Sequence, residues 1–426
     1  MAVSPSGEYY DDLETMSPQE RETYLNGALA MHVRHAYELA PAAKKLLDGA
    51  GVAPENIRTV KDLEKLPVTR KPELIAMQQA DPPYGGVAAL PIADVQRVFI
   101  SPGPIYEIQP PEVAWFAKSF WAAGFRRGDV AINTFTYHLS PAGILFHEAI
   151  RDCGGTVVVA GTGNTDLQIQ IMRDLKVTAF VGTPSYLMMV IERIKAMGLD
   201  FKKDFNVARA WFTGEMLAPS LRDTFEKDYL IDTYQAYAVT EPGGAIAYEC
   251  KVKAGMHLMD EYVTEIIDPE TGRQLGPGEV GEIVVTPLCN PDWGLVRFGT
   301  GDLSSYYEEP CPCGRTAPRI AGIVGRAGDA VKVRGMFIVA TQARDAIMDT
   351  RKVSRYQLIV GRAKHRDSLT LRVELSDPAD NTDRFKDDLN NRFQGYCRIK
   401  IDAIEVVTPG RIPEDAQGLR DERKWE

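Results

Sequence analysis

The first half of the chain alternates between helical and strand-like patterns of hydrophobic residues. Residues 14–50 have helical periodicity and open with Ser17-Pro18-Gln19-Glu20, which predicts a capping box with proline at the first helical position. Short apolar runs at 130–135, 156–161 and 178–183 predict strands. Helices are predicted between and beside them, at 113–124, 142–153 and 165–175. Strands that alternate with helices are typical of a parallel sheet with helices on its faces.

The second half of the chain has a different pattern. Residues 207–212 and 230–235 predict further strands, whereas proline, glycine and aspartate punctuate residues 262–286 and predict antiparallel hairpins there. After Gly325–Gly328 a second set of elements begins, with strands predicted at 331–339, 356–362, 368–375 and 399–407 and helices at 341–350 and 381–394. We therefore expect an α/β fold with a large core domain of parallel and mixed sheets over residues 1–325, and a small α+β domain over residues 326–426.

Composition and charge exclude several classes of protein. The 426 residues are 44% hydrophobic and 25% charged, as in ordinary globular proteins. A net charge of -10, from 49 Lys+Arg against 59 Asp+Glu, argues against nucleic acid or an anionic membrane as the main partner. No apolar run reaches about 18 residues, so we expect no membrane span. Met1–Asp12 lacks the features of a secretory signal, and six cysteines in so long a chain predict reduced thiols in the cytoplasm.

Four potential metal ligands, Cys250, His257, Cys311 and Cys313, lie in two glycine-containing loops. Thiolates and imidazole are the ligands that tetrahedral zinc prefers, and four of them form a closed structural site. Such a site would join the Cys250/His257 loop to the Cys311-Pro312-Cys313 turn. The spacing is not that of a zinc finger, so the pattern leaves an alternative open: free buried cysteines and a surface histidine.

A set of short segments suggests nucleotide binding. Tyr237-Ala238-Val239-Thr240-Glu241 follows a predicted strand, and Gly301-Asp302-Leu303, Gly325-Arg326 and Lys332-Val333-Arg334-Gly335 come later in the chain. A threonine and a carboxylate can hold phosphate and Mg²⁺, and an aspartate beside an arginine suits a ribose diol. Each segment alone is weak evidence for nucleotide binding, because most aspartates in turns are simply solvated. Their order and spacing make the combination stronger.

These segments and several others resemble phenylacetate-CoA ligase-type enzymes of the adenylate-forming superfamily, the AMP-binding acyl-CoA synthetases. The matching segments extend from about residue 14 to 413 and include TPSY (183–186), WFTGEML (211–217), QAYAVTEPGG (235–244), TGDL (300–303), CPCGRT (311–316) and GRAGDAVKVRG (325–335). The resemblance implies a ligase that forms an acyl-adenylate from ATP and a carboxylic acid and transfers the acyl group to coenzyme A. It also implies a small C-terminal domain that swings about a hinge, here expected at Gly328-Asp329.

The same resemblance assigns roles to individual residues of the nucleotide site. Ala236 and Tyr237 would lie against the adenine of ATP or AMP. Thr240 would contact the α-phosphate, and Glu241 would bind Mg²⁺. The ribose hydroxyls would be held by Asp302, helped by Arg326.

Further assignments concern the acyl pocket and the metal. Gly214 and Glu215 would shape the pocket for nucleotide and acid, and His138 resembles the gating residue beside the acid carboxylate. Tyr137 and Tyr186 are candidate pocket walls and, with other aromatic residues nearby, suggest an aromatic acid. Some family members place Cys, His and a Cys-x-Cys pair at a zinc site, which strengthens the prediction of structural zinc.

The chain departs from the family pattern at two places. The loop that wraps the ATP phosphates in the family corresponds to residues 101–110, where Pro102 and Pro104 remove two backbone donors, no lysine is present, and Glu107 would repel phosphate. At the C-terminus, Leu419 stands where the catalytic lysine is expected. Arg420 or Lys424 could substitute, although a guanidinium is wider and planar.

These departures leave three functions open. The first is an active aryl- or acyl-CoA ligase with a variant phosphate loop, and the second is an ATP-independent enzyme that uses acyl-CoA. The third is a non-catalytic binding protein derived from the fold. The expected partners are a small carboxylic acid, a nucleotide and coenzyme A, with no nucleic acid and no membrane, and a homodimer is possible.

Overall fold

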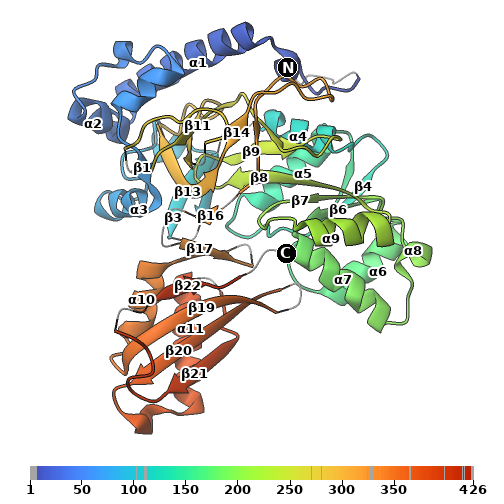
Figure 1. Cartoon of the computed structure of the whole chain (residues 1–426), viewed down its shortest axis with the longest axis vertical. Helices are drawn as coiled ribbons and strands as arrows, with labels where there is room; N and C mark the ends of the chain where they lie inside the picture. Colours follow the sequence, from blue (N-terminus) through green and yellow to red (C-terminus); the bar gives the residue numbers. More distant parts are fainter. Residues whose placement is uncertain are drawn as a thin grey trace.

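The computed structural model describes residues 7–101, 103–109, 113–269, 271–279, 281–323, 325–326, 330–334, 336–363, 366–397, 399–414, 416 and 418–423. The predicted hinge, Gly328-Asp329, lies outside the described residues, and so do Pro102 and Lys424. The predicted fold class is confirmed: a large α/β core precedes a small α+β domain, which lies below the core in Figure 1.

A nine-stranded sheet forms the centre of the core. Its order is β14-β15-β10-β9-β8-β7-β6-β4-β5. The parallel half contains β4 (Val130–Asn133), β5 (Thr156–Val159), β6 (Ala179–Gly182), β7 (Arg209–Phe212) and β8 (Asp232–Val239). The antiparallel half contains β9 (Gly244–Glu249), β10 (Met256–Leu258), β14 (Tyr306–Tyr307) and β15 (Arg319–Ile320). The carboxyl ends of the parallel strands therefore meet at one edge of the sheet.

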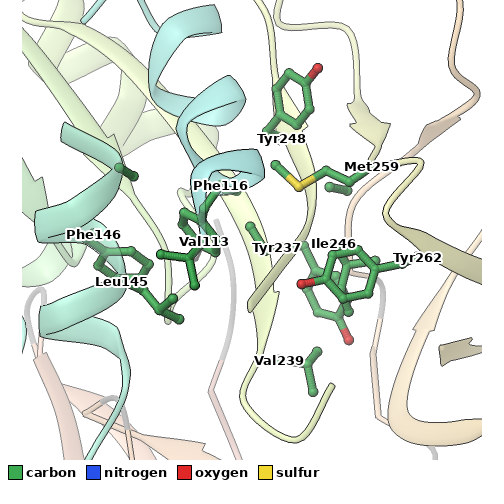
Figure 2. Packing of buried hydrophobic residues seen from close by; sticks show 14 of the residues in the cluster. Val113, Phe116, Leu145, Phe146, Tyr237, Val239, Ile246, Tyr248, Met259 and Tyr262 are labelled. Atoms are coloured by element: carbon green, nitrogen blue, oxygen red, sulfur yellow. The ribbon is translucent and has the colours of Figure 1, made fainter. Parts of the chain in front are cut away.

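Helices follow the parallel strands, as the alternating pattern predicts. They are α4 (Ala117–Ala122), α5 (Ala142–Asp152), α6 (Thr165–Asp174), α7 (Pro184–Ala196), α8 (Phe201–Asp204) and α9 (Pro219–Asp223). Figure 2 shows how the helical and strand layers meet: Leu145 and Phe146 of α5 lie near Phe116, opposite side chains from the strands such as Tyr237 and Val239 of β8. The close packing of these large side chains holds the end of β8 in a fixed position.

A second sheet and the N-terminal helices complete the core. The sheet comprises β1 (Thr69–Arg70), β13 (Phe298–Ser304), β12 (Gly281–Pro287), β11 (Tyr262–Ile267) and β16 (Gly325–Arg326). Beside it stand α1 (Pro18–Leu39), α2 (Pro41–Gly49), α3 (Lys71–Ala80) and a hairpin of β2 (Arg97–Ser101) and β3 (Ile105–Gln109). The predicted capping box is confirmed, because Ser17 N donates to Glu20 Oε2 at 2.8 Å and Glu20 N donates to Ser17 Oγ at 3.3 Å.

The small domain packs two helices on a four-stranded sheet. The sheet order is β21 (Ala403–Val407), β20 (Arg366–Leu375), β19 (Val353–Ala363) and β22 (Leu419–Asp421). The remaining elements are β17 (Ala330–Val333), β18 (Met336–Val339), α10 (Ala340–Met348) and α11 (Asp383–Cys397). The predicted boundary at residue 325 falls within β16, which pairs with β13 of the core and so brings Arg326 beside Asp302. None of the helices in the described part of the chain has both the length and the apolar character that crossing a bilayer requires.

Candidate functional site

A cavity of about 1210 Å³ lies at the carboxyl ends of the parallel strands, between the core and the small domain. Its walls include the segments that follow β4, β6 and β7 and the end of β8. The small domain contributes residues from the β17–β18 turn, the start of β20 and helix α11. In open α/β sheets this edge is where ligands bind.

Five of the predicted site residues line this cavity, namely His138, Tyr186, Gly214, Glu215 and Thr240. Tyr137 is not among the lining residues. Its hydroxyl accepts a hydrogen bond from Asn133 Nδ2 at 2.9 Å, and its ring lies edge-on to His147. Tyr137 therefore supports the wall from behind, whereas His138 is exposed at the cavity itself.

Glu215 is held in the cavity wall by the start of α7. Thr183 caps this helix by accepting a hydrogen bond from Tyr186 N at 3.3 Å, with Pro184 at the first helical position. The next residue, Ser185, donates from its hydroxyl to Glu215 Oε1 at 2.7 Å. Burial raises the pKa of the Glu215 carboxyl, and the hydrogen bonds from Ser185 partly oppose that shift. The TPSY segment therefore fixes one wall of the cavity.

The predicted ribose site is a three-residue cluster that joins the two sheets of the core. Tyr237 of β8 donates from its hydroxyl to Asp302 Oδ2 at 2.8 Å, and Arg326 Nε lies 3.1 Å from Asp302 Oδ1. Burial and the negative charge of Asp302 raise the pKa of Tyr237 well above its usual value, so the hydroxyl remains a donor. Ala236 is buried beside Tyr237 on the same strand. The three polar groups are thus prearranged, and the carboxylate is oriented by two donors.

Glu241, at the end of β8, has a partner that the sequence analysis missed. Lys71 Nζ, at the first residue of α3, donates to Glu241 Oε1 at 2.7 Å. Trp293 Nε1 donates to the backbone carbonyl of Glu241 at 3.0 Å and so fixes the position of this turn. No local pattern pointed to Lys71, which lies 170 residues before its partner in the chain.

The β2–β3 hairpin occupies the place of the phosphate loop. Ser101, Gly103 and Pro104 line the cavity, but Glu107 points inward and is buried. Ser101 Oγ donates to Glu107 Oε1 at 2.5 Å, and Glu107 Oε2 has no hydrogen-bond partner among the described residues. Burial, together with the negative charge of Glu241, raises the pKa of Glu107 to about 8. The expected repulsion of phosphate is therefore weak near neutral pH, because this carboxyl is largely protonated.

The C-terminal departure lies on the small domain, away from this cavity. Leu419 pairs with Leu358 in the sheet and packs against the core of its own domain. Arg420 Nε lies 2.9 Å from Glu422 Oε1. In this arrangement of the two domains, neither residue lines the cavity.

The four predicted zinc ligands come together in a buried cluster. Their ligand atoms lie within 4.8 Å of one another. Cys250 Sγ and Cys311 Sγ are 3.7 Å apart, and Cys313 Sγ is 3.4 Å from His257 Nε2. Tetrahedral zinc with Zn–S bonds of about 2.3 Å places two sulfurs roughly 3.8 Å apart, so the cluster fits this ion. His257 Nδ1 lies 3.1 Å from the Ala317 carbonyl, which orients the ring with Nε2 toward the thiols.

The N-terminal segment encloses this cluster. Tyr9 donates from its hydroxyl to the Cys313 carbonyl at 3.1 Å. Arg315 Nε donates to Glu14 Oε1 at 2.5 Å, and both side chains are buried. Tyr248, which lies between His257 and Ala236 in the sheet, also donates to Glu14 Oε1, at 2.7 Å. One strand, β9, therefore separates the strand that carries His257 from β8, which carries Ala236 and Tyr237.

Comparisons with known proteins agree with this geometry. The sequence profile of a family described as AMP-binding enzyme matches residues 113–287. A phenylacetate-coenzyme A ligase of Aromatoleum evansii is 32% identical over 88% of this chain and 86% of its own length. One from Thermus thermophilus is 30% identical over 87% of this chain and 85% of its own length.

Solved structures of one related ligase share this fold, and their TM-scores against this chain differ with the state of that ligase. A 2-hydroxyisobutyryl-CoA ligase in the thioesterification state, in complex with an acyl-adenylate and coenzyme A, superposes with a TM-score of 0.92 at 25% identity, covering 98% of this chain and 93% of that one. The same ligase in the postadenylation state gives a TM-score of 0.73 over the same coverage. The predicted resemblance is confirmed: this chain belongs to the phenylacetate-CoA ligase family of AMP-binding enzymes.

Proposed function

We propose that this protein is an acyl-CoA ligase. It would join a carboxylic acid to AMP with release of pyrophosphate, then transfer the acyl group to the thiol of coenzyme A with release of AMP. The observation that carries the proposal is the cavity itself, which is enclosed by both domains and has Thr240 at the end of β8 on its wall. The neighbouring Tyr237–Asp302–Arg326 cluster supports it, since a carboxylate with a fixed orientation suits a ribose diol.

Within this reaction the described residues have distinct tasks. Asp302 accepts hydrogen bonds from the ribose hydroxyls, and the hydroxyl of Thr240 contacts the α-phosphate. Glu241 would hold Mg²⁺, because its carboxylate supplies an oxygen ligand directly after β8. When bound, Mg²⁺ would neutralise negative charge on the phosphates. His138 lies at the exposed end of the wall and would cover the acid carboxylate.

We also propose that the acid is aromatic. Phe135, Leu145 and Phe146 line the cavity. The rings of Phe135 and Phe146 meet edge-to-face with their centroids 4.7 Å apart, which leaves an apolar surface suited to another ring. Tyr186, whose hydroxyl donates to Gln168 Oε1 at 2.8 Å, would form a second aromatic wall.

Zinc would have a structural role. Cys250, His257, Cys311 and Cys313 supply four ligands and leave no open position for a substrate. Reduced thiols are needed for this, and we propose that the protein acts in the cytoplasm. A homodimer is the commonest symmetric assembly, and light scattering on the purified protein tests it.

The decisive experiment is an acid screen for pyrophosphate release. The purified protein is incubated with ATP, Mg²⁺, coenzyme A and a panel of aryl and short aliphatic acids, and pyrophosphate and the CoA thioester are both measured. Acid-dependent pyrophosphate release followed by thioester formation supports the proposal. Turnover of an added acyl-CoA without ATP would instead identify an ATP-independent enzyme that uses acyl-CoA, and the absence of all these reactions would identify a binding protein.

A further inference from the structure

The β2–β3 hairpin carries polar side chains on its buried face. Its register pairs Phe99 with Glu107 and Arg97 with Gln109, so Glu107 and Gln109 project from the same face of β3. Only 4% of Glu107 and 6% of Gln109 are exposed. Burying a carboxyl group is costly unless it has partners, so the surroundings of Glu107 decide what this residue can bind.

Three side-chain oxygens around β3 lack a hydrogen-bond donor. They are Glu107 Oε2, Gln109 Oε1 and Asn290 Oδ1, each of them buried and without a partner in the described part of the chain. Asn290 lies directly beside the strand, because its Nδ2 donates to the carbonyl of Ile108 at 3.0 Å. Oxygen acceptors of this kind suit a hard cation and not an anion such as phosphate. This side of the hairpin therefore favours a positive charge.

One turn of the core holds β3 next to the segment that carries Glu241. Asn290 binds the carbonyl of Ile108, and Trp293, three residues further on, donates from Nε1 to the carbonyl of Glu241 at 3.0 Å. The backbone N–H of Trp293 donates to the Asn290 carbonyl at 3.1 Å, which closes the turn. The neighbours of Glu107 and the backbone of Glu241 are thus attached to the same turn.

The carboxyl groups of Glu107 and Glu241 are close enough to influence each other. Burial, together with the negative charge of Glu241, raises the pKa of Glu107 to about 8, and the positive charge of Lys71 opposes this shift. Lys71 also pairs with Glu241 at 2.7 Å, so the same ammonium group serves both carboxyl groups. A divalent cation between two carboxylates removes their repulsion and provides a partner for oxygens that have no donor.

We propose that Glu107 is a second carboxylate ligand of the divalent cation assigned to Glu241, so that the cation is held between the β2–β3 hairpin and the end of β8. This inference rests on the proposed function, which assigns Mg²⁺ to Glu241. Glu107 belongs to the segment in which this chain departs from the family pattern, where Pro102 and Pro104 remove backbone donors and no lysine is present. When bound, the cation would supply the positive charge that this hairpin lacks for a phosphate group.

Titration of the full-length protein with Mn²⁺ alone, without ATP or acid, tests the proposal. Mn²⁺ prefers the same oxygen ligands as Mg²⁺, and electron paramagnetic resonance measures the Mn²⁺ that stays free. We expect Glu107→Gln and Glu241→Gln each to weaken Mn²⁺ binding about tenfold or more, because each removes one charged ligand. Glutamine still accepts the hydrogen bond from Ser101, so Glu107→Gln should fold. Glu107→Asp keeps a carboxylate and should bind Mn²⁺ more tightly than Glu107→Gln.

Glu148→Gln is the matched control. Glu148 pairs with Arg97 of β2, so it lies beside the same hairpin, but it does not line the cavity. This variant should bind Mn²⁺ like the wild type. The proposal is overturned if Glu107→Gln binds Mn²⁺ as tightly as this control, or if the wild-type protein binds no Mn²⁺ at millimolar concentration. Because Mn²⁺ binding is measured without turnover, a protein that binds Mn²⁺ through Glu107 but releases no pyrophosphate with any acid would refute the proposed function and retain the cation site.

Discussion

Lys71 Nζ lies 2.7 Å from Glu241 Oε1, in a contact between the start of α3 and the end of β8. The side chains are only 14% and 3% exposed, so the ion pair is shielded from solvent at the proposed Mg²⁺ site. The β2–β3 hairpin provides no lysine for the ATP phosphates. In the proposed function Lys71 would supply a cation near the phosphates from a different element of the fold.

Replacing Lys71 should impair adenylation. In Lys71→Met the leaving pyrophosphate loses a positioned cation, and we expect acid-dependent pyrophosphate release to fall about 10²–10³-fold. Lys71→Arg should retain part of the activity, because it keeps the charge but changes its shape. Lys61→Met, at an exposed pair with Glu64, is the matched control and should behave as wild type. Wild-type rates in Lys71→Met would show that this cation takes no part in adenylation.

Glu107 should make stability depend on pH. Its pKa in the folded protein is raised from 4.5 to about 8, so the folded state binds a proton that the unfolded state releases. The stabilisation from this group is complete below about pH 4.5 and is lost as pH rises towards 8. Between pH 6 and pH 8 we expect wild type to lose about 2 kcal/mol of unfolding free energy relative to Glu107→Gln.

Urea denaturation of both proteins at the two pH values measures this difference. Glutamine keeps an oxygen that can accept the hydrogen bond from Ser101, so the variant should fold. Parallel pH profiles of wild type and Glu107→Gln would mean that Glu107 is ionised in the folded protein throughout this range.

Zinc removal should lower the stability of the fold more than it lowers the rate of the catalysed reaction. We expect one zinc per chain by elemental analysis, and Cys311→Ser should lose it because three ligands hold the ion less tightly than four. Chelation should lower the melting temperature while initial turnover is spared, since the four ligands do not line the cavity. Cys153→Ala, whose thiol lies outside the cluster, should keep its zinc. A wild-type protein purified without metal, and as stable after chelation as before, would contradict the prediction.

The N-terminal segment should be necessary for stability. Glu14 accepts hydrogen bonds from Arg315 and Tyr248, and both members of the Glu14–Arg315 ion pair are buried. Glu14→Ala leaves the guanidinium buried without its counter-charge, and we expect a loss of about 3–5 kcal/mol in unfolding free energy. Lys227→Ala, at an exposed pair with Asp223, should cost less than about 0.5 kcal/mol. Equal urea midpoints for the two variants would show that the Glu14–Arg315 pair adds nothing to stability.

Local patterns in the sequence were sufficient to predict most elements of the fold. The capping box at Ser17 depends on residues three apart, and the strands of the parallel sheet depend on short apolar runs, so each is visible without the rest of the chain. Residues 14–50 were predicted as helical, and the chain bends at Ala40-Pro41 because proline cannot donate to the preceding turn. The resemblance to the family also pointed to His138 and Glu215, whereas the cysteine and histidine pattern by itself indicated the metal ligands.

Other properties of the site depend on contacts between residues far apart in the chain. Glu14 and Arg315 are 301 positions apart, and Lys71 and Glu241 are 170 apart. From the sequence, Glu107 was expected to repel phosphate. In the structure its side chain is buried, and burial raises the pKa of this carboxyl so that it holds a proton. The cavity lined by both domains exists only because the small domain folds against the core. Periodicity and capping depend on neighbours along the chain, whereas ion pairing, burial and pKa depend on which elements the tertiary fold brings together.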